Sequence, residues 1–248
     1  MQLTIFFTPA EVAAIDAPAN TIYIVIDVIR ATTTLTVMLE RGAKGILIAN
    51  TIEQAQNAAR MVPGRLLCGE RHALPLPGFD YGNSPVQFSQ LDLYDRELIL
   101  TTTNGTRAFF ACPNESHHLA GCFYNAQAVA ARAIALARKN GGDIALVCAA
   151  EAGYFALDDA TCAGYLALEL QRQYSDLQAH ESVSAATALY ATYTPPKLLD
   201  YSNSARSVAN AGLHEDLAFC MKISESTCVP TVLGRDAETG LLRIGVDE

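Results

Sequence analysis

The sequence of 248 residues lacks the features that mark several large classes of protein. No apolar run approaches the ~20 residues of a membrane span, and the amino-terminal segment has neither the basic start nor the long apolar core of a signal peptide. The basic residues form no cluster, and the net charge is −9. We therefore expect a cytoplasmic protein that binds neither nucleic acids nor membranes.

Several catalytic and metal-binding motifs are absent too. No G-x-x-x-x-G-K-[ST] or G-x-G-x-x-G pattern occurs, which argues against P-loop NTPases and dinucleotide enzymes of the standard pattern, and no G-x-S-x-G motif occurs either. The seven cysteines include no C-x-x-C pair and lie mostly in apolar segments. Free, buried thiols are therefore expected.

The sequence does contain a repeated alternation of short apolar runs with segments of helical spacing. The runs predict strands at 22–26, 45–49, 66–68, 98–100, 121–124 and 143–149. Helices are predicted at 34–41, 52–61 and 126–139, and a further helix is predicted to end near Tyr174. Residues 181–221 are predicted to be helical, with a break at Pro195–Pro196. We expect one α/β domain over residues 1–248. It has a mixed, largely parallel sheet between helices in three layers, a helical carboxy-terminal region and a terminal hairpin within 229–246.

Acidic residues follow or neighbour the ends of several predicted strands. Because strand carboxyl ends bring distant segments together, these acids are expected to cluster, and their oxygens suit Mg²⁺. Taken singly, each acid is more often a helix cap or a partner in a surface ion pair, and Asp158 and Asp159 also suit the first turn of a helix. The candidate metal ligands are Asp27, Glu70, Asp80, Asp158 and Asp159, and Glu151 lies in a similar place.

Two threonine triplets mark turns where a strand gives way to a helix. They are Thr32–Thr34, beside Arg30, and Thr101–Thr103, beside Arg107. Hydroxyls, arginines and first-turn N–H groups can together bind an anion, and Asn104–Gly105 can expose further backbone donors. Threonine is also common in strands and at helix starts, so either triplet alone is more often structural.

Four segments together resemble the 2-phosphosulfolactate phosphatase family. They are "VIDVIRATTTLTVMLERGA", "CGERHALPLPGFDYGNSPVQF", "LILTTTNGTRA" and "LVCAAEAGYFALDDATCAG". The resemblance extends to "SNSARSVANAGLHEDLAFC" and so covers nearly the whole chain. The family pattern usually has glycine at Ala150 and glutamate at Asp158, and this chain departs from it at both positions.

The resemblance implies a magnesium-dependent phosphatase that hydrolyses 2-phospho-3-sulfolactate to 3-sulfolactate and phosphate, a step of coenzyme M biosynthesis. We hypothesise that Asp27, with Glu70 or Asp80, helps to hold Mg²⁺, and that Asp27, Arg30 and Asn104 are catalytic. Attack by water and attack by a carboxylate both stay open. The expected substrate-binding residues are Thr32, Thr33, Thr34, Arg71, Asn83, Thr102, Thr103, Gly105 and Arg107.

Two other functions fit the same residues. One is a phosphatase of the same fold that acts on a different phosphorylated hydroxy acid, since pocket shape decides specificity. The other is a non-catalytic binder of anionic metabolites. The alanine-rich helical region near the carboxyl terminus offers a surface for self-association, and a homodimer is the hypothesis that it suggests.

Overall fold

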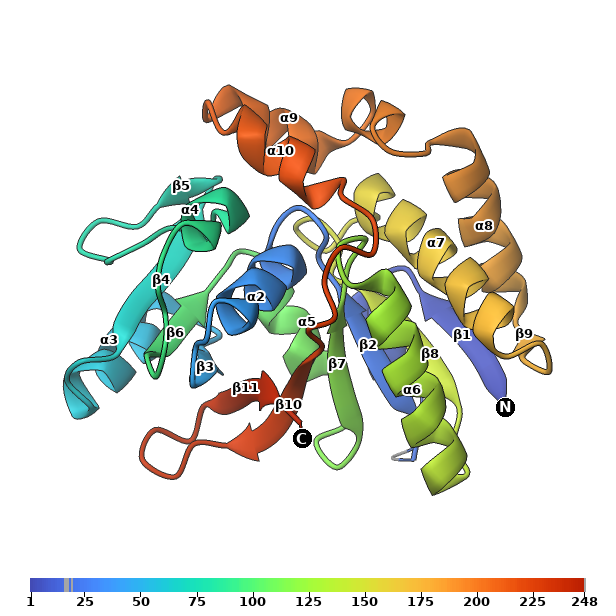
Figure 1. Ribbon diagram of the computed structural model, residues 1–248, viewed down its shortest axis with the longest axis horizontal. Coiled ribbons are helices and arrows are strands. Elements are labelled where there is room, and N and C mark those ends of the chain that lie inside the picture. The colour runs from blue at the N-terminus through green and yellow to red at the C-terminus, as the bar shows by residue number, and fades with distance from the viewer. Residues whose placement is uncertain (16–17, 19, 248) are drawn as a thin grey trace.

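One mixed sheet runs through the centre of the computed structural model, which describes residues 1–15, 18 and 20–247 (Figure 1). In this described part the sheet has 11 strands in the order β5-β4-β6-β3-β11-β10-β7-β2-β8-β1-β9. The strands are β1 (Gln2–Phe6), β2 (Ile22–Ile26), β3 (Gly45–Ile48), β4 (Leu66–Arg71), β5 (Leu74–Pro75), β6 (Glu97–Thr101), β7 (His117–Gly121), β8 (Ile144–Cys148), β9 (Gln178–Ala179), β10 (Pro230–Arg235) and β11 (Leu242–Val246).

The terminal hairpin lies in the middle of the sheet and joins two parallel sets of strands. Strands β4, β6 and β3 pair in parallel, as do β7, β2, β8, β1 and β9. Strand β11 pairs antiparallel with β3, and β10 pairs antiparallel with β7. The last two strands of the chain therefore pair with strands that lie much earlier in the sequence.

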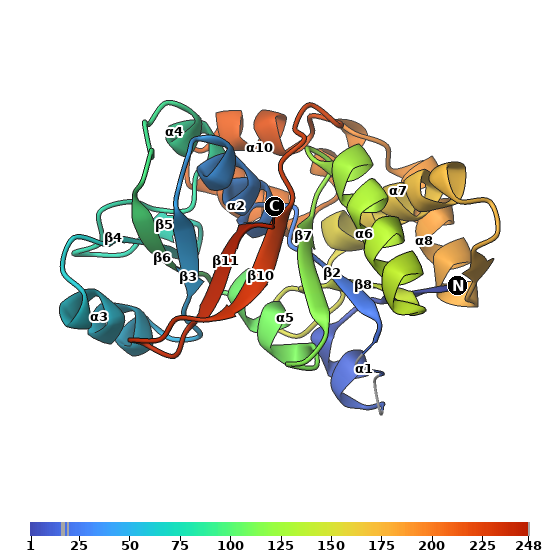
Figure 2. The ribbon, with the colours of Figure 1, turned by 60° about the horizontal axis from the view of Figure 1, so that its bottom comes forward.

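Helices cover both faces of the sheet and complete the predicted three layers. Figure 2 shows α1, α3 and α5 on one side and α2, α6, α7 and α8 on the other. The helices are α1 (Pro9–Ala13), α2 (Ala31–Glu40), α3 (Ile52–Met61), α4 (Pro85–Ser89), α5 (Gly105–Ala111), α6 (Ala126–Asn140), α7 (Leu157–Gln173), α8 (Glu181–Thr192), the 3₁₀ helix η1 (Lys197–Asp200), α9 (Asn203–Asn210) and α10 (His214–Cys220).

Most of the predicted elements are confirmed. All five residues of β2 are buried, as expected for a strand covered on both faces. The prediction of a strand at 121–124 is wrong, because β7 ends at Gly121 and the Cys122 N–H donates to Asn125 Oδ1 in a turn before α6. The sequence patterns do not predict strands β1, β5 and β9 or helices α1 and α4.

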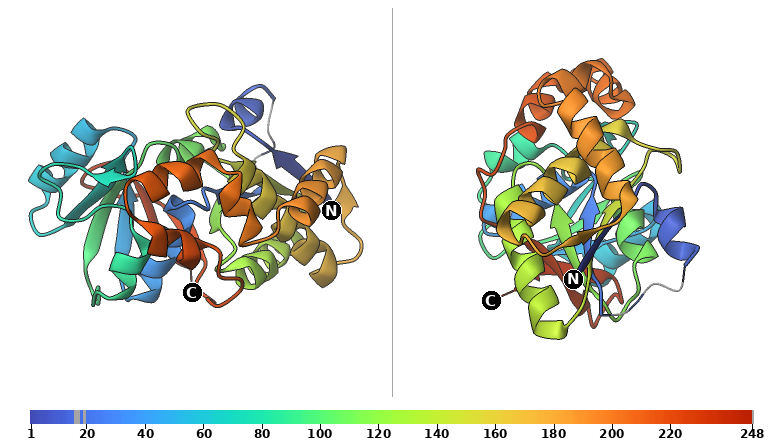
Figure 3. Two further views of the ribbon diagram at one scale, coloured as in Figure 1. Left: turned by 90° about the horizontal axis from the view of Figure 1, so that it is seen from above. Right: turned by 90° about the vertical axis from the view of Figure 1, so that its right-hand side faces the viewer.

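The helical carboxy-terminal region covers the strand ends. Helices α9 and α10 lie at the top of Figure 1, and the view from above in Figure 3 shows them across the middle of the molecule. All seven cysteines are free thiols and six are buried, as the sequence indicates. In the described residues, no helix is both long and apolar enough to cross a membrane.

Candidate active site

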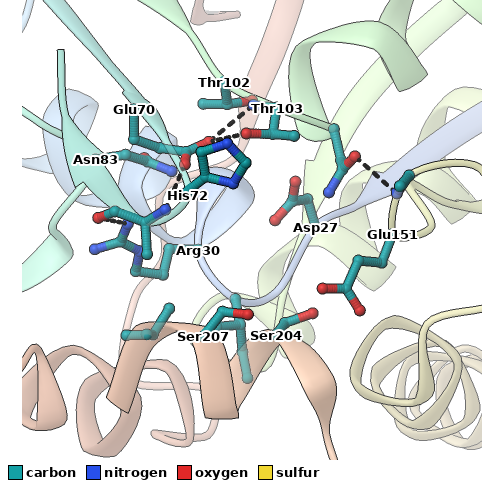
Figure 4. A pocket seen from close by; sticks show the side chains of 15 residues that line it. Asp27, Arg30, Glu70, His72, Asn83, Thr102, Thr103, Glu151, Ser204 and Ser207 are labelled. Carbon is teal, nitrogen blue, oxygen red and sulfur yellow. Dashed lines mark hydrogen bonds between the residues drawn. The ribbon is translucent and has the colours of Figure 1, made fainter. Parts of the chain in front are cut away.

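A cavity of about 230 Å³ opens where segments that follow four strands meet helix α9. Asp27 follows β2, Glu70 lies near the end of β4, and Glu151 follows β8, and these three carboxylates open onto the same space (Figure 4). The cavity brings together residues far apart in the sequence. Seven of the predicted site residues line it, namely Asp27, Arg30, Glu70, Asn83, Thr102, Thr103 and Asn104.

Asp27 is a buried carboxylate at the end of β2. Only 8% of its surface is exposed, and its Oδ1 accepts a hydrogen bond of 3.1 Å from the N–H of Ala31 at the start of α2. Its pKa is raised to about 7, mainly because burial disfavours the charged form and also because Asp158 and Glu70 carry like charge. Near neutral pH, Asp27 can therefore exist in both protonation states.

Helix α5 approaches Asp27 closely because it begins with a glycine. A Cβ atom added at Gly105 would lie 2.5 Å from Asp27 Oδ2 and 2.5 Å from the side chain of Ala31. No other residue type fits this position without a shift of its neighbours. Gly105 does not line the cavity, but it sets the distance between Asp27 and the turn that follows β6.

Glu70 fixes two loops of the cavity wall. Its Oε1 accepts hydrogen bonds from the Thr103 N–H at 2.8 Å and from the Thr103 hydroxyl at 2.9 Å, and its Oε2 accepts one of 3.0 Å from the Ala73 N–H. Both His72 and Ala73 have positive φ angles, 54° and 65°. Such angles are uncommon outside glycine and often occur at functional sites.

Arg30 lines the cavity, but its guanidinium group is already held by protein groups. Its Nη1 forms a buried ion pair of 2.8 Å with Asp216 Oδ2 on α10, and its Nη2 donates to Ala73 O at 2.8 Å. Asp216 Oδ1 also accepts a hydrogen bond of 2.6 Å from the Ser84 hydroxyl. Arg30 therefore connects α2, α10 and the loop after β4.

Two amide side chains offer hydrogen-bonding groups to a ligand. Asn83 is 4% exposed, and its buried Oδ1 has no hydrogen-bond partner. Asn104 Oδ1 accepts a hydrogen bond of 3.2 Å from the Ala152 N–H, which ties the turn after β6 to the loop after β8. An unsatisfied oxygen in a buried position is costly unless a ligand or water meets it.

Asp158 and Asp159 lie behind the cavity wall in the first turn of α7. Asp159 accepts hydrogen bonds from the N–H groups of Val28 at 3.0 Å and Ala150 at 3.2 Å, and Asp158 accepts one of 3.2 Å from the Ser204 hydroxyl. Burial raises the pKa of Asp158 to about 6 and also raises that of Asp159, which Asp158 and Asp27 raise further.

The five expected metal ligands do not form one set. Asp80 is exposed, and its carboxylate accepts a hydrogen bond of 2.8 Å from the Leu67 N–H, away from the cavity. Asp158 and Asp159 are not among the lining residues. Over residues 1–15, 18 and 20–247, no three His, Cys, Asp or Glu side chains are arranged as a metal site.

The first threonine triplet also lies outside the cavity. The Thr32 and Thr33 hydroxyls donate to the carbonyls of Asp27 and Val28 at 2.9 Å each, and all three threonines are fully buried. Helix α2 begins at Ala31, earlier than the predicted 34, so the triplet belongs to its first turns. These hydroxyls satisfy backbone carbonyls of the turn rather than facing the cavity.

The two remaining arginines of the expected set lie elsewhere. Arg71 donates to Glu70 O at 2.6 Å and to Thr101 Oγ1 at 3.3 Å, and it does not line the cavity. Arg107 is exposed on α5 and also lies outside the lining residues. Neither guanidinium group therefore reaches the carboxylates described above.

Several lining residues were not among the sequence candidates. Figure 4 shows Ser204 and Ser207, which come from α9, and His72. Val208 also comes from α9, and His72 and Ala152 lie in loops and have positive φ angles. The serines lie at helical spacing on α9, within the segment "SNSARSVANAGLHEDLAFC" that shares the family resemblance, but no residue pattern places that helix at the strand ends. Glu151, which the sequence places after a predicted strand beside the candidate metal ligands, also lines the cavity.

Comparisons with known proteins point to one family. A family profile described as 2-phosphosulpholactate phosphatase matches residues 6–234 of the chain. A Deinococcus radiodurans protein named "Probable 2-phosphosulfolactate phosphatase" is 38% identical over 223 residues, which cover 89% of this chain and 91% of that protein. Two proteins of the same name, from Thermus thermophilus and Thermotoga petrophila, are each 34% identical. These matches cover 88% and 85% of this chain, and 90% and 88% of the relatives.

Proposed function

The chain belongs to the 2-phosphosulfolactate phosphatase family, and we propose that it hydrolyses 2-phospho-3-sulfolactate to 3-sulfolactate and phosphate, as in coenzyme M biosynthesis. The observation that carries this proposal is the position of Asp27. It is a buried carboxylate with a pKa raised to about 7, and it lines a cavity together with two further carboxylates. Perturbed carboxylates in a cavity are typical of catalytic sites.

Magnesium fits the donor set of this cavity. Asp27 Oδ2 and both carboxylate oxygens of Glu151 accept no hydrogen bond from the described residues, whereas Glu70 already accepts three. Mg²⁺ usually takes one or two carboxylates and completes its shell with water and phosphate oxygens. We therefore propose Asp27 and Glu151 as its protein ligands. When bound, the ion would neutralise charge on the phosphoryl group.

The other lining groups are suited to orient the phosphoryl group. The Asn104 Nδ2 group makes no hydrogen bond to a described residue, so it is free to donate to a phosphoryl oxygen. Thr102 Oγ1 accepts from the Thr106 N–H at 3.1 Å, which leaves its own hydroxyl proton for a ligand. Fixed donors of this kind stabilise charge that develops in the transition state.

One route is attack by a water molecule on the phosphoryl group. Mg²⁺ bound at Asp27 Oδ2 would keep the Asp27 carboxylate ionised, so the pKa of about 7 describes the metal-free protein and Asp27 would not take the proton of that water. Direct attack by the Asp27 carboxylate is the alternative, and it would leave a phosphorylated Asp27. Mass spectrometry of the protein quenched during turnover distinguishes the two routes, because only the second adds a phosphoryl group to the chain.

The proposed function is tested by measuring phosphate release from 2-phospho-3-sulfolactate with Mg²⁺ and with a chelator. We expect turnover with Mg²⁺, none with the chelator, and none in Asp27→Asn. Asp176→Asn, a change at an exposed aspartate, is the matched control. If another phosphorylated hydroxy acid gave a higher kcat/KM than 2-phospho-3-sulfolactate, that ester would be the better candidate for the substrate. Binding of the ester without turnover in the unmodified protein would favour a non-catalytic binder.

A further inference from the structure

A second cavity, of about 540 Å³, continues from the first one along helix α9. Glu151, Ala152 and Ser207 line both cavities, so the two share a wall. We call the second cavity the annex. Its other lining residues are Tyr154, Phe155, Asn203, Arg206 and Asn210.

Among the described residues that line the first cavity, none offers a free arginine or lysine side chain to an anionic substrate. Among its described lining residues, Arg30 is the one arginine or lysine, and its guanidinium group is bound to Asp216 and to Ala73 O. Three carboxylates line the same space. A substrate with a second anionic group, besides the phosphoryl group, therefore needs a positive partner outside this cavity.

The annex contains such a partner in Arg206. The side chain is exposed, and its Nη2 donates to Asn203 Oδ1 at 2.8 Å. Among the described residues, no carboxylate lies within ion-pairing distance of it, whereas Arg30, Arg65 and Arg243 all form ion pairs. Its remaining N–H groups are therefore available to a ligand.

The neighbours of Arg206 on α9 complete a polar surface for an oxyanion. Asn203, Arg206, Ser207 and Asn210 follow helical spacing, which puts them on one face of the helix towards the annex. A guanidinium group offers two parallel N–H donors, which match the oxygens of a carboxylate or a sulfonate. Glu151 on the shared wall would repel an anion wherever its charge is not compensated, and Arg206 is the one arginine or lysine among the described residues that line the annex.

We propose that the annex binds the carboxylate or sulfonate of the substrate and that Arg206 is the residue that selects for it. This inference rests on the proposed function, because it assumes that the phosphoryl group lies at Asp27 in the first cavity. The two cavities then divide the recognition of one ester. Arg206 would contribute to binding but not to the bond that breaks.

The test compares Arg206→Gln with the unmodified protein on two esters. We expect KM for 2-phospho-3-sulfolactate to rise roughly 10- to 100-fold, as for loss of a charge-assisted hydrogen bond, with kcat changed less than about 2-fold. For p-nitrophenyl phosphate, which has no second anionic group, kcat/KM should not change. Arg206→Lys should recover part of the loss. Arg138→Gln, at an exposed arginine of α6 outside both cavities, is the control.

A second measurement separates this inference from the proposed function. Calorimetric titration with 3-sulfolactate, which has no phosphoryl group, measures occupancy of the annex without turnover. We expect Arg206→Gln to weaken this binding and Arg138→Gln to leave it unchanged. Should the protein release no phosphate and still show this difference, the phosphatase proposal fails and the annex stands. Equal binding in Arg206→Gln, equal KM values, or no binding to the unmodified protein would overturn the inference.

Discussion

Replacement of Asp27 by asparagine is expected to stabilise the metal-free protein above pH 7 and to abolish phosphate release. The pKa of Asp27 is raised from 3.8 to about 7, because its charged form is buried among other carboxylates. A difference of roughly 3 units corresponds to about 4 kcal/mol of folding free energy, at about 1.4 kcal/mol per unit. Asparagine keeps an oxygen for the Ala31 N–H and carries no charge.

The sign of the pH dependence follows from the direction of this shift. The folded state binds the Asp27 proton more tightly than the unfolded state does, so protonation favours folding. This contribution is complete below pH 3.8 and is lost as the pH rises through about 7. Asp158 and Asp159, whose pKa values are also raised, act in the same direction but remain in the variant.

The assay is urea unfolding in the presence of a chelator at pH 5 and at pH 8.5. From the two pKa values, the stability advantage of Asp27→Asn should grow by roughly 2–3 kcal/mol between these pH values. Asp176→Asn, at an exposed position, should show no such growth. Added Mg²⁺ at pH 8.5 should stabilise the unmodified protein more than the variant, since a ligand of the folded state raises its stability.

Two results would refute this reasoning. An advantage of Asp27→Asn that is the same at pH 5 and pH 8.5 would mean that the carboxylate carries no burial penalty. Retained phosphate release in the variant would mean that the charge of Asp27 is not needed for the reaction. The first result would refute the raised pKa of Asp27, and the second would refute its role in catalysis.

Three further substitutions test other parts of the site. Thr33→Val removes the 2.9 Å hydrogen bond to Val28 O, so urea unfolding should show a loss of about 1–2 kcal/mol with nearly unchanged phosphate release. Gly105→Ala places a Cβ atom 2.5 Å from Asp27 Oδ2, so kcat/KM should fall more than about 10-fold while circular dichroism shows a folded protein. Ala150→Gly relieves a φ angle of 65°, and thermal unfolding should show a gain of about 0.5–1 kcal/mol.

The sequence indicates the strands and helices better than it indicates their arrangement. The apolar runs predict β2 and β8 because both strands are fully buried, and the hairpin of β10 and β11 is also predicted. Nothing local says that this hairpin pairs with β3 on one side and with β7 on the other. Those pairings depend on contacts between residues more than 100 positions apart, which periodicity does not encode.

The sequence likewise indicates only some of the residues that line the first cavity. Strand ends indicate Asp27, Glu70 and Asn104, because polar residues there lie at the edge of a buried sheet, and all three residues line the first cavity. The Thr32 hydroxyl has the same chemistry as that of Thr102, but it donates to a backbone carbonyl behind the cavity. Which hydroxyls face a ligand and which satisfy the backbone depends on the turn geometry that only the structure gives.

The structure shows a physical consequence of the alanine at position 150, one of the two positions where this chain departs from the family pattern. The usual glycine at position 150 suits the positive φ of 65° found there, and alanine adopts that angle only at some cost. The Ala150 N–H donates to Asp159, so the strained angle keeps a buried carboxylate of the site satisfied. This hydrogen bond holds the loop that carries Glu151 at the cavity, which offsets the conformational cost of the positive φ angle.

The distribution of charge in the site connects the two proposals. An acidic protein of net charge −9 must attract an ester with several negative groups, and the first cavity adds three carboxylates to that problem. A divalent cation at Asp27 would compensate the charge of the phosphoryl group, and Arg206 would pair with the remaining anion. A protein with this arrangement should discriminate against esters that lack the second anion mainly through KM, because the group that selects lies apart from the group that reacts.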